Sequence, residues 1–164
     1  GKWWYRYSDG SYPINRWTVI NGAWYHFDNA GWMQTGWLRD GSNWYYLDTN
    51  GVMRTGWIKE KNTWYHLDES GAMHTGWLLD GLNWYYLDTN GAMRTGWYRV
   101  GNDWYYSNNS GVMQTDKWIG DYYVTSLGAM ATNIWIGRYH VNASGLWDQT
   151  SSVQEQHVDW YVPL

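Results

Sequence analysis

A 20-residue internal repeat constrains the fold of this 164-residue chain more than any other feature of its sequence. Tryptophan–tyrosine pairs recur at this interval, beginning at Trp4, Trp24, Trp44, Trp64, Trp84 and Trp104. A second tryptophan follows the same period, at Trp17, Trp37, Trp57, Trp77 and Trp97. A repeat of this length is typical of solenoids, in which each unit buries its apolar face against its neighbours.

Each repeat is predicted to form a β-hairpin. Asp40 and Gly41 separate two aromatic runs, and such a pair is typical of a tight hairpin turn. With these two as the central turn residues, Trp37 lies directly opposite Trp44, and both rings project from one face. Strand alternation places Tyr45 on the other face. We therefore predict an all-β fold of stacked hairpins.

The composition excludes several classes of function. The chain has 17 Trp and 16 Tyr but one Phe, and its formal net charge is -4. This charge argues against a nucleic-acid partner, which would require a basic surface. The absence of Cys excludes disulfides and thiolate metal ligands. No apolar run approaches the ~20 residues of a membrane span, so we expect no spanning segment. We also expect no metal or other cofactor.

The paired tryptophans can form a binding site for a cation. Trp37 and Trp44 provide two walls of an aromatic box, Tyr65 of the next repeat provides a third, and Met73 provides an apolar floor. Aromatic faces attract a quaternary ammonium group, whose methyl groups need no hydrogen-bond partner. The alternative is that these rings only pack as core and cross-strand pairs. Against it, Trp carries an N–H group and is an awkward sole filler of a dry core.

The identity of the third wall is open at this point. The residue after the second Trp is Tyr in every regular repeat, whereas the next position varies between Tyr and His, as His26 and His66 show. A cage wall must stay aromatic, which favours the first of these positions. If that tyrosine is instead buried in the core, the following position forms the wall.

These motifs resemble the choline-binding repeats of the cell-wall-binding repeat family, which occur on pneumococcal surface proteins, autolysins and phage lysins. The resemblance covers roughly residues 3–147 and rests on the repeated pattern Gly-Trp, Trp-Tyr-Tyr-Leu-Asp and Gly-x-Met-x-Thr. It implies a left-handed superhelical solenoid of hairpin repeats of about 20 residues. It also implies that the ligand is choline or phosphocholine on teichoic and lipoteichoic acids.

In this family, two Trp of one repeat and a Tyr of the next enclose the choline, often with a Met. Carried over to this chain, the resemblance implies five cages. Their residues are Trp17, Trp24, Tyr45 and Met53; Trp37, Trp44, Tyr65 and Met73; Trp57, Trp64, Tyr85 and Met93; Trp77, Trp84, Tyr105 and Met113; and Trp97, Trp104, Tyr122 and Met130. The fifth set spans a change of repeat length. After Trp118 and Trp135 the second Trp is replaced by Asp121 and Arg138, so no cage of the family type is expected there.

The repeats also suggest how the chain is organised. We expect a repeat array over residues 1–147, with degenerate units at 1–16 and 118–147. Residues 148–164 fit no repeat and are a candidate cap or dimerisation segment. We expect a non-catalytic module of a longer protein, such as an amidase-type lysin or a surface protein. It would act outside the cell on the bacterial wall, or after release by a phage at lysis.

Two other functions were weighed. A glucan-binding module would also be rich in aromatic repeats, but sugars need hydrogen-bonding side chains beside one flat ring, whereas paired Trp and Met favour a cation. An enzyme would need acid and base groups, and Asp28, Asp48, Asp68 and Asp88 recur before a Gly, where they are predicted to cap turns.

Basic residues near the hairpin turns are candidate contacts for a ligand phosphate: Arg39, Lys59 and Arg99.

Overall fold

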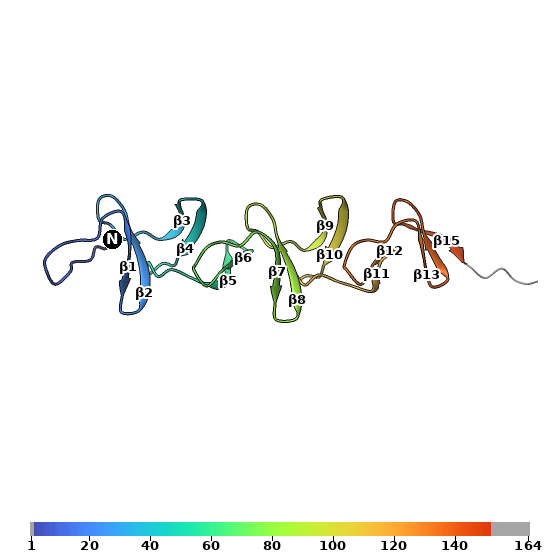
Figure 1. Ribbon diagram of the computed structural model, residues 1–164, viewed down its shortest axis with the longest axis horizontal. Coiled ribbons are helices and arrows are strands. Elements are labelled where there is room, and N and C mark those ends of the chain that lie inside the picture. Colours follow the sequence, from blue (N-terminus) through green and yellow to red (C-terminus); the bar gives the residue numbers. More distant parts are fainter. Residues whose placement is uncertain (1, 152–164) are drawn as a thin grey trace, which may run out of the picture. The chain divides into compact units, whose positions relative to one another are not determined.

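The computed structural model describes residues 2–151, and all regular secondary structure in this range is β (Figure 1). Its strands are β1 (Arg16–Ile20), β2 (Ala23–Phe27), β3 (Gly36–Asp40), β4 (Asn43–Leu47), β5 (Gly56–Glu60), β6 (Thr63–Leu67), β7 (Gly76–Asp80), β8 (Asn83–Leu87), β9 (Gly96–Val100), β10 (Asp103–Ser107), β11 (Lys117–Ile119), β12 (Tyr122–Val124), β13 (Ile134–Ile136), β14 (Tyr139–Val141) and β15 (Trp147–Ser151). The strands pair two by two as antiparallel hairpins, from β1–β2 to β13–β14, and β15 adds to β14. The predicted all-β fold of successive hairpins is confirmed.

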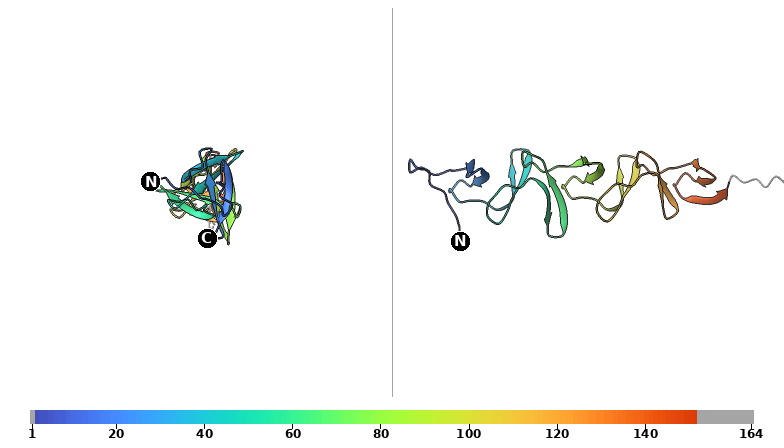
Figure 2. Two further views of the ribbon diagram at one scale, coloured as in Figure 1. Left: turned by 90° about the vertical axis from the view of Figure 1, so that its left-hand side faces the viewer. Right: turned by 90° about the horizontal axis from the view of Figure 1, so that it is seen from below.

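The chain divides into two compact units, Gly1–Arg94 and Thr95–Leu164. The first contains the hairpins from β1 to β8, and the second contains β9 to β15. Within the first unit, the β1–β2 and β3–β4 hairpins project to different sides (Figures 1 and 2). In the described part of the chain, no helix has the length and apolar character that a membrane crossing requires.

The predicted register of the hairpins is wrong by one turn position. Trp37 pairs with Tyr46 rather than with Trp44, and the turn centres on Gly41 and Ser42. Gly41 has a φ of 59°, and a glycine at the first central position is what a type II′ turn requires. The cross-strand partner of Trp37 thus moves by two residues, which keeps the alternation of faces, so the two tryptophans stay on one face as diagonal neighbours.

Successive hairpins are joined by a backbone hydrogen bond that the methionine segment makes. The N–H of Met53 donates to the carbonyl of Trp24 at 2.8 Å, and Met130 makes the same bond to Trp104 at 2.7 Å in the second unit. Met53 also forms an isolated β-bridge with Leu47 of its own repeat. The methionine of one repeat is thereby held beside the second tryptophan of the repeat before it.

The core is thin and contains about one large aliphatic or aromatic side chain per repeat. The side chains with at most 1% exposure include Phe27, Leu47, Leu67, Leu87, Val124 and Val141. In β10, Ser107 takes this place and hydrogen-bonds to the hydroxyl of Tyr98 at 2.9 Å. The second tryptophan of each regular pair is 40–45% exposed at Trp24, Trp44, Trp64, Trp84 and Trp104. These indoles are therefore not core residues.

The recurring aspartates cap the turns, as predicted. Oδ1 of Asp48 accepts hydrogen bonds from the N–H groups of Asn50 and Val52, at 2.9 and 3.0 Å. Equivalent bonds form at Asp28, Asp68, Asp88, Asn108 and Asn142. Within residues 2–151, no group of three or more His, Asp or Glu side chains is placed to hold a metal ion.

Candidate functional site: aromatic cages

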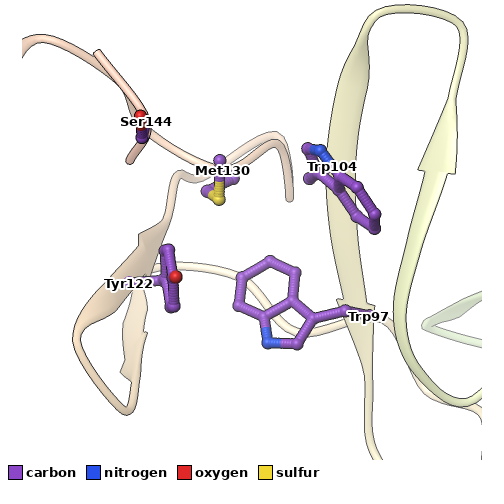
Figure 3. Close-up of a pocket in the computed structure, with 5 residues that line it drawn as sticks. All are labelled: Trp97, Trp104, Tyr122, Met130 and Ser144. Atoms are coloured by element: carbon purple, nitrogen blue, oxygen red, sulfur yellow. The ribbon is translucent and has the colours of Figure 1, made fainter. Parts of the chain in front are cut away.

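An open aromatic pocket of about 350 Å³ lies in the second unit (Figure 3). It is lined by Trp97 of β9, Trp104 of β10, Tyr122 of β12, Met130 and Ser144. The rings of Trp97 and Tyr122 meet edge to face, with centroids 5.5 Å apart and planes at 69°. The four residues of the fifth expected set therefore surround one pocket, although the repeat length changes within it.

Local structure explains why these side chains converge. Trp97 pairs with Tyr106 across the hairpin, so Trp104 stands two residues away on the same face. The bond from the Met130 N–H to the Trp104 carbonyl places the methionine next to the second indole. Two walls thus come from one hairpin, and the third wall and the floor come from the next repeat.

The first expected set forms a similar pocket in the first unit. This pocket has a volume of about 580 Å³, and its lining includes Trp17, Trp24, Tyr45 and Met53. Trp17 and Tyr45 are edge to face at 5.0 Å. Glu69, from the turn of a later repeat, also lines it. The pocket therefore combines an aromatic interior with one carboxylate.

The second and third sets show the same ring contacts within the first unit. Trp37 lies 4.9 Å from Tyr65, and the N–H of Met73 donates to the Trp44 carbonyl at 2.7 Å. In the third set the corresponding distances are 4.9 Å from Trp57 to Tyr85 and 2.9 Å from Met93 N to Trp64 O. In the fourth set, Trp77 and Trp84 lie 6.4 Å apart in the first unit. Its Tyr105 and Met113 belong to the second unit, so this set stays a prediction.

The two candidate positions for the third ring have different surroundings. The pockets are lined by the tyrosine that follows the second-Trp position, as Tyr45 and Tyr122 show, and in the latter repeat Asp121 stands at that position. The following position contacts the first Trp inside its own hairpin, and Tyr46 lies 5.2 Å from Trp37 in this way. The first tryptophan is thus held between a ring of its own hairpin and a ring of the next repeat.

Acidic side chains near the hairpin turns fix some of these rings. The indole N–H of Trp17 donates to Asp40 at 2.9 Å, and that of Trp57 donates to Asp80 at 2.8 Å. In the intervening repeat, Glu60 instead accepts a bond from the hydroxyl of Tyr46 at 2.7 Å, which raises the pKa of this tyrosine. The sequence reasoning did not assign Asp40, Asp80 or Glu60 to the cages, because their contacts join different repeats.

Basic residues near the cages are sparse. Among the candidate phosphate contacts, Lys59 places its Nζ atom 5.9 Å from the ring centroid of Trp64. This is cation–π distance, so the exposed face of Trp64 already attracts a positive group. Burial lowers the pKa of His66, which packs against Trp57 at 5.1 Å, and the nearby His74 lowers it further.

Two further aromatic pockets were missed by the sequence analysis. One, of about 320 Å³, is lined by residues that include Trp4, Tyr25 and Met33. These three follow the 20-residue period of Trp24, Tyr45 and Met53, so the signal was present. It was overlooked because Ser11 and Pro13 make the first unit degenerate. The other contains Trp118, Tyr139 and Trp147, and no periodic signal identified it.

The structure thus defines a class of protein: a β-hairpin repeat module whose repeats present open aromatic boxes. Comparison with known families gives the same answer. Residues 15–55, 54–95 and 112–147 match models described as a choline-binding repeat, and residues 95–113 match a putative cell wall binding repeat. The chain belongs to the choline-binding repeat family, which confirms the resemblance seen in its motifs.

Solved structures support this membership. CbpJ from Streptococcus pneumoniae is 44% identical with a TM-score of 0.77, and the match covers 84% of this chain and 49% of CbpJ. Choline binding protein F from the same species, solved with a peptidoglycan analogue, is 41% identical with a TM-score of 0.79, covering 85% and 48%. The endolysin of phage Cp-1, solved with choline, is 43% identical with a TM-score of 0.51, covering 68% and 34%. The chain spans about half the length of the first two structures.

These similarities also support the predicted fold class, since the matched structures are built from the same repeats. A comparison with curated protein sequences gave no match.

Proposed function

We propose that this chain is a non-catalytic module that binds choline on the teichoic and lipoteichoic acids of a bacterial cell wall. The observation that carries the proposal is the pocket formed by Trp97, Trp104, Tyr122 and Met130, which offers three rings and a thioether and no charged lining group. Such a surface attracts a quaternary ammonium group through its ring faces and asks for no hydrogen-bond donor. The same residue types recur in the other expected cages.

One cage alone gives weak binding. Each ring contributes about 0.5–2 kcal/mol to the attraction of a cation. The loss of rotational and translational freedom offsets much of this gain, which leaves a dissociation constant on the order of millimolar. A polymer with many choline groups engages several cages at once, and its affinity rises through effective concentration. The number of cages therefore matters more for wall attachment than the strength of any one of them.

The proposed role is to hold a larger protein on the wall. The chain matches an endolysin of phage Cp-1 and two pneumococcal choline-binding proteins over less than half of their lengths. We propose that the parent protein is a wall hydrolase of the lysin type or a surface protein, acting outside the cell. Dimerisation through residues 118–164 also remains a prediction, and its residues 152–164 lie outside the described part of the chain. Light scattering with and without choline tests it.

Calorimetry with free choline tests the function. The full chain is expected to give saturable heat in the millimolar range and a rise in melting temperature, because a ligand that binds only the folded state stabilises it. Trp104→Ala is expected to lose the share of heat that belongs to one cage. Trp135→Ala, which removes an exposed indole that does not line this pocket, serves as the matched control.

Two outcomes would contradict the proposal. The first is the absence of both heat and thermal stabilisation at choline concentrations on the order of tens of millimolar. The second is retention of the chain on dextran without any response to choline, which would favour the glucan-binding alternative.

A further inference from the structure

The second unit contains an aromatic pocket that does not follow the regular cage pattern. It has a volume of about 310 Å³ and is lined by Trp118, Gly120, Asp121, Tyr139 and Trp147. The rings of Trp118 and Tyr139 are perpendicular, with centroids 6.0 Å apart. Tyr139 and Trp147 are also perpendicular, at 5.7 Å. Three rings thus meet where the sequence pattern shows one Trp per hairpin.

Hydrogen bonding shows how this pocket relates to the neighbouring cage. The N–H of Trp147 donates to the carbonyl of Asp121 at 2.8 Å, just as the N–H of Met130 donates to the carbonyl of Trp104. Trp147 therefore occupies the position of the methionine, and Asp121 occupies the position of the second tryptophan. Compared with a regular cage, the second indole thus stands at the methionine position, and an acidic residue stands at the position of the second tryptophan.

The consequence is a pocket with as many rings as the cage of Trp97 and Trp104 and with an acidic residue in its lining, a feature that it shares with the first cage, where Glu69 takes this role. Asp121 is exposed at the turn between β11 and β12, and it lines the pocket together with the rings. The adjacent cation, Arg138, lies with its guanidinium carbon 5.8 Å from the Tyr139 ring centroid and is not one of the lining residues. In the cage of Trp97 and Trp104, the corresponding lining contains Ser144 and no acidic residue.

We propose that this pocket binds an organic ammonium group that keeps at least one N–H bond, in preference to a quaternary ammonium group. The three rings attract either cation. Only the protonated amine also donates a charge-assisted hydrogen bond to the Asp121 carboxylate. A quaternary group attracts the carboxylate by its charge but offers only methyl groups there, so the carboxylate loses hydration without gaining a hydrogen bond. This inference goes beyond the proposed function, because it assigns a second ligand preference to a different pocket.

Two probes of nearly equal size test the proposal. Choline and protonated N,N-dimethylethanolamine differ by one N-methyl group replaced by a hydrogen. The full chain is labelled with 5-fluorotryptophan, and the fluorine resonances of Trp118, Trp147, Trp97 and Trp104 are assigned with single Trp→Phe variants. Each probe is titrated at neutral pH, so that one sample reports on both pockets.

The resonances of Trp118 and Trp147 are expected to respond to dimethylethanolamine with an affinity about fivefold higher than to choline. The resonances of Trp97 and Trp104 are expected to show no such preference. Asp121→Asn keeps the shape of the pocket and removes its charge, and it should abolish the preference. Trp147→Met, which restores the floor of a regular repeat, should weaken both probes.

Two results would overturn the inference: resonances of Trp118 and Trp147 that do not respond to either probe, or an unchanged preference in Asp121→Asn. Failure of the proposed function looks different. In that case Trp97 and Trp104 do not respond to choline, whatever happens in the pocket of Trp118.

Discussion

The regular repeats and the short C-terminal repeats build their aromatic pockets from different positions. In the regular repeats, both strands of the hairpin have five residues, and each supplies one tryptophan. The strands β11 to β14 have three residues each, and the positions that correspond to the second tryptophan, Asp121 and Arg138, fall in the turns. In the pocket of Trp118, the second indole comes instead from Trp147, in the position of a methionine. An aromatic wall can therefore be supplied from different sequence positions, as long as its ring reaches the same pocket.

The two regions share their mode of stacking. Several turn glycines have positive φ and lie against the methionine of an earlier repeat, as Gly71 does with Met53 in the regular repeats and Gly145 with Met130 in the short ones. The hydrogen bond from the methionine position to the earlier hairpin is also kept. The short repeats thus change the site but keep the contacts that join one hairpin to the next.

The largest expected difference between the regions concerns the core. Leu67→Ala should lower the free energy of unfolding by about 2–5 kcal/mol, because Leu67 is fully buried and its loss leaves a cavity. Val141→Ala in the short repeats should cost less, about 1–3 kcal/mol, because fewer methyl groups are removed. Denaturant unfolding of each variant measures both values. Equal losses of unfolding free energy in the two variants would contradict the expectation that the larger buried side chain contributes more.

The shared stacking contact gives the next largest effect. Gly71→Ala should destabilise the fold by about 2–4 kcal/mol, because Gly71 has a φ of 85° and the new Cβ would lie 2.5 Å from Sδ of Met53. Gly41→Ala is the matched control, since it also has positive φ but meets no atom within 4 Å, and it should cost about 1–2 kcal/mol. Thermal unfolding distinguishes the two. If both variants are destabilised equally, the close approach of Gly71 to Met53 makes no separate contribution to stability.

A smaller effect is expected on binding. Asp40→Asn weakens the acceptor that holds the indole of Trp17, so choline affinity at this cage should fall about two- to fivefold, with little change in stability because the contact is exposed. The cage of Trp97 in the same protein is the internal control. Fluorine NMR of labelled tryptophans reads both cages. An equal loss at the two cages would contradict a local positioning role for Asp40.

The smallest expected effect is a pH dependence of stability that arises from His66 in a regular repeat, where it lies opposite Trp57. One short repeat has a histidine at the corresponding position, His140 opposite Trp135. Burial holds the pKa of His66 below its ordinary value of 6.5, so the unfolded chain takes up a proton more readily than the folded one. The stability that the neutral imidazole contributes is present above this value and is lost as the pH falls through the folded-state pKa. His66→Tyr, which restores the residue found in sister repeats, should flatten this decline.

Melting temperatures between about pH 8 and pH 5 test the His66 prediction, since this range brackets the ordinary pKa of histidine. The difference between the wild-type chain and His66→Tyr should grow as the pH falls. His74→Gln should reduce the decline partly, because it removes one of the charges that lower the pKa of His66. Parallel curves for all three proteins would contradict the assignment.

The repeat period, together with the turn residues and strand alternation, predicted the hairpins, the turn-capping aspartates and the placement of both Trp side chains on one face. These features depend on residues close in sequence, and strand alternation turns their spacing into geometry. The hairpin register was predicted wrongly, because Asp40-Gly41 and Gly41-Ser42 are both plausible turns and only the fold selects one. The shift kept the faces unchanged, so the two tryptophans of each regular hairpin still lie on one face.

The sequence by itself determined the repeat family and the all-β hairpins, and it pointed to the residues that line the pockets of Trp17 and Trp97, because the same local pattern recurs at one spacing. Only the tertiary structure decided which carboxylate holds each indole, and that Trp147 meets Trp118 and Tyr139 in a pocket. These contacts join residues of different repeats, and the sequence does not indicate the partners of the acidic residues at the ends of the strands or of Trp147. Their geometry depends on how one hairpin stacks on another, and a linear spacing does not contain that information.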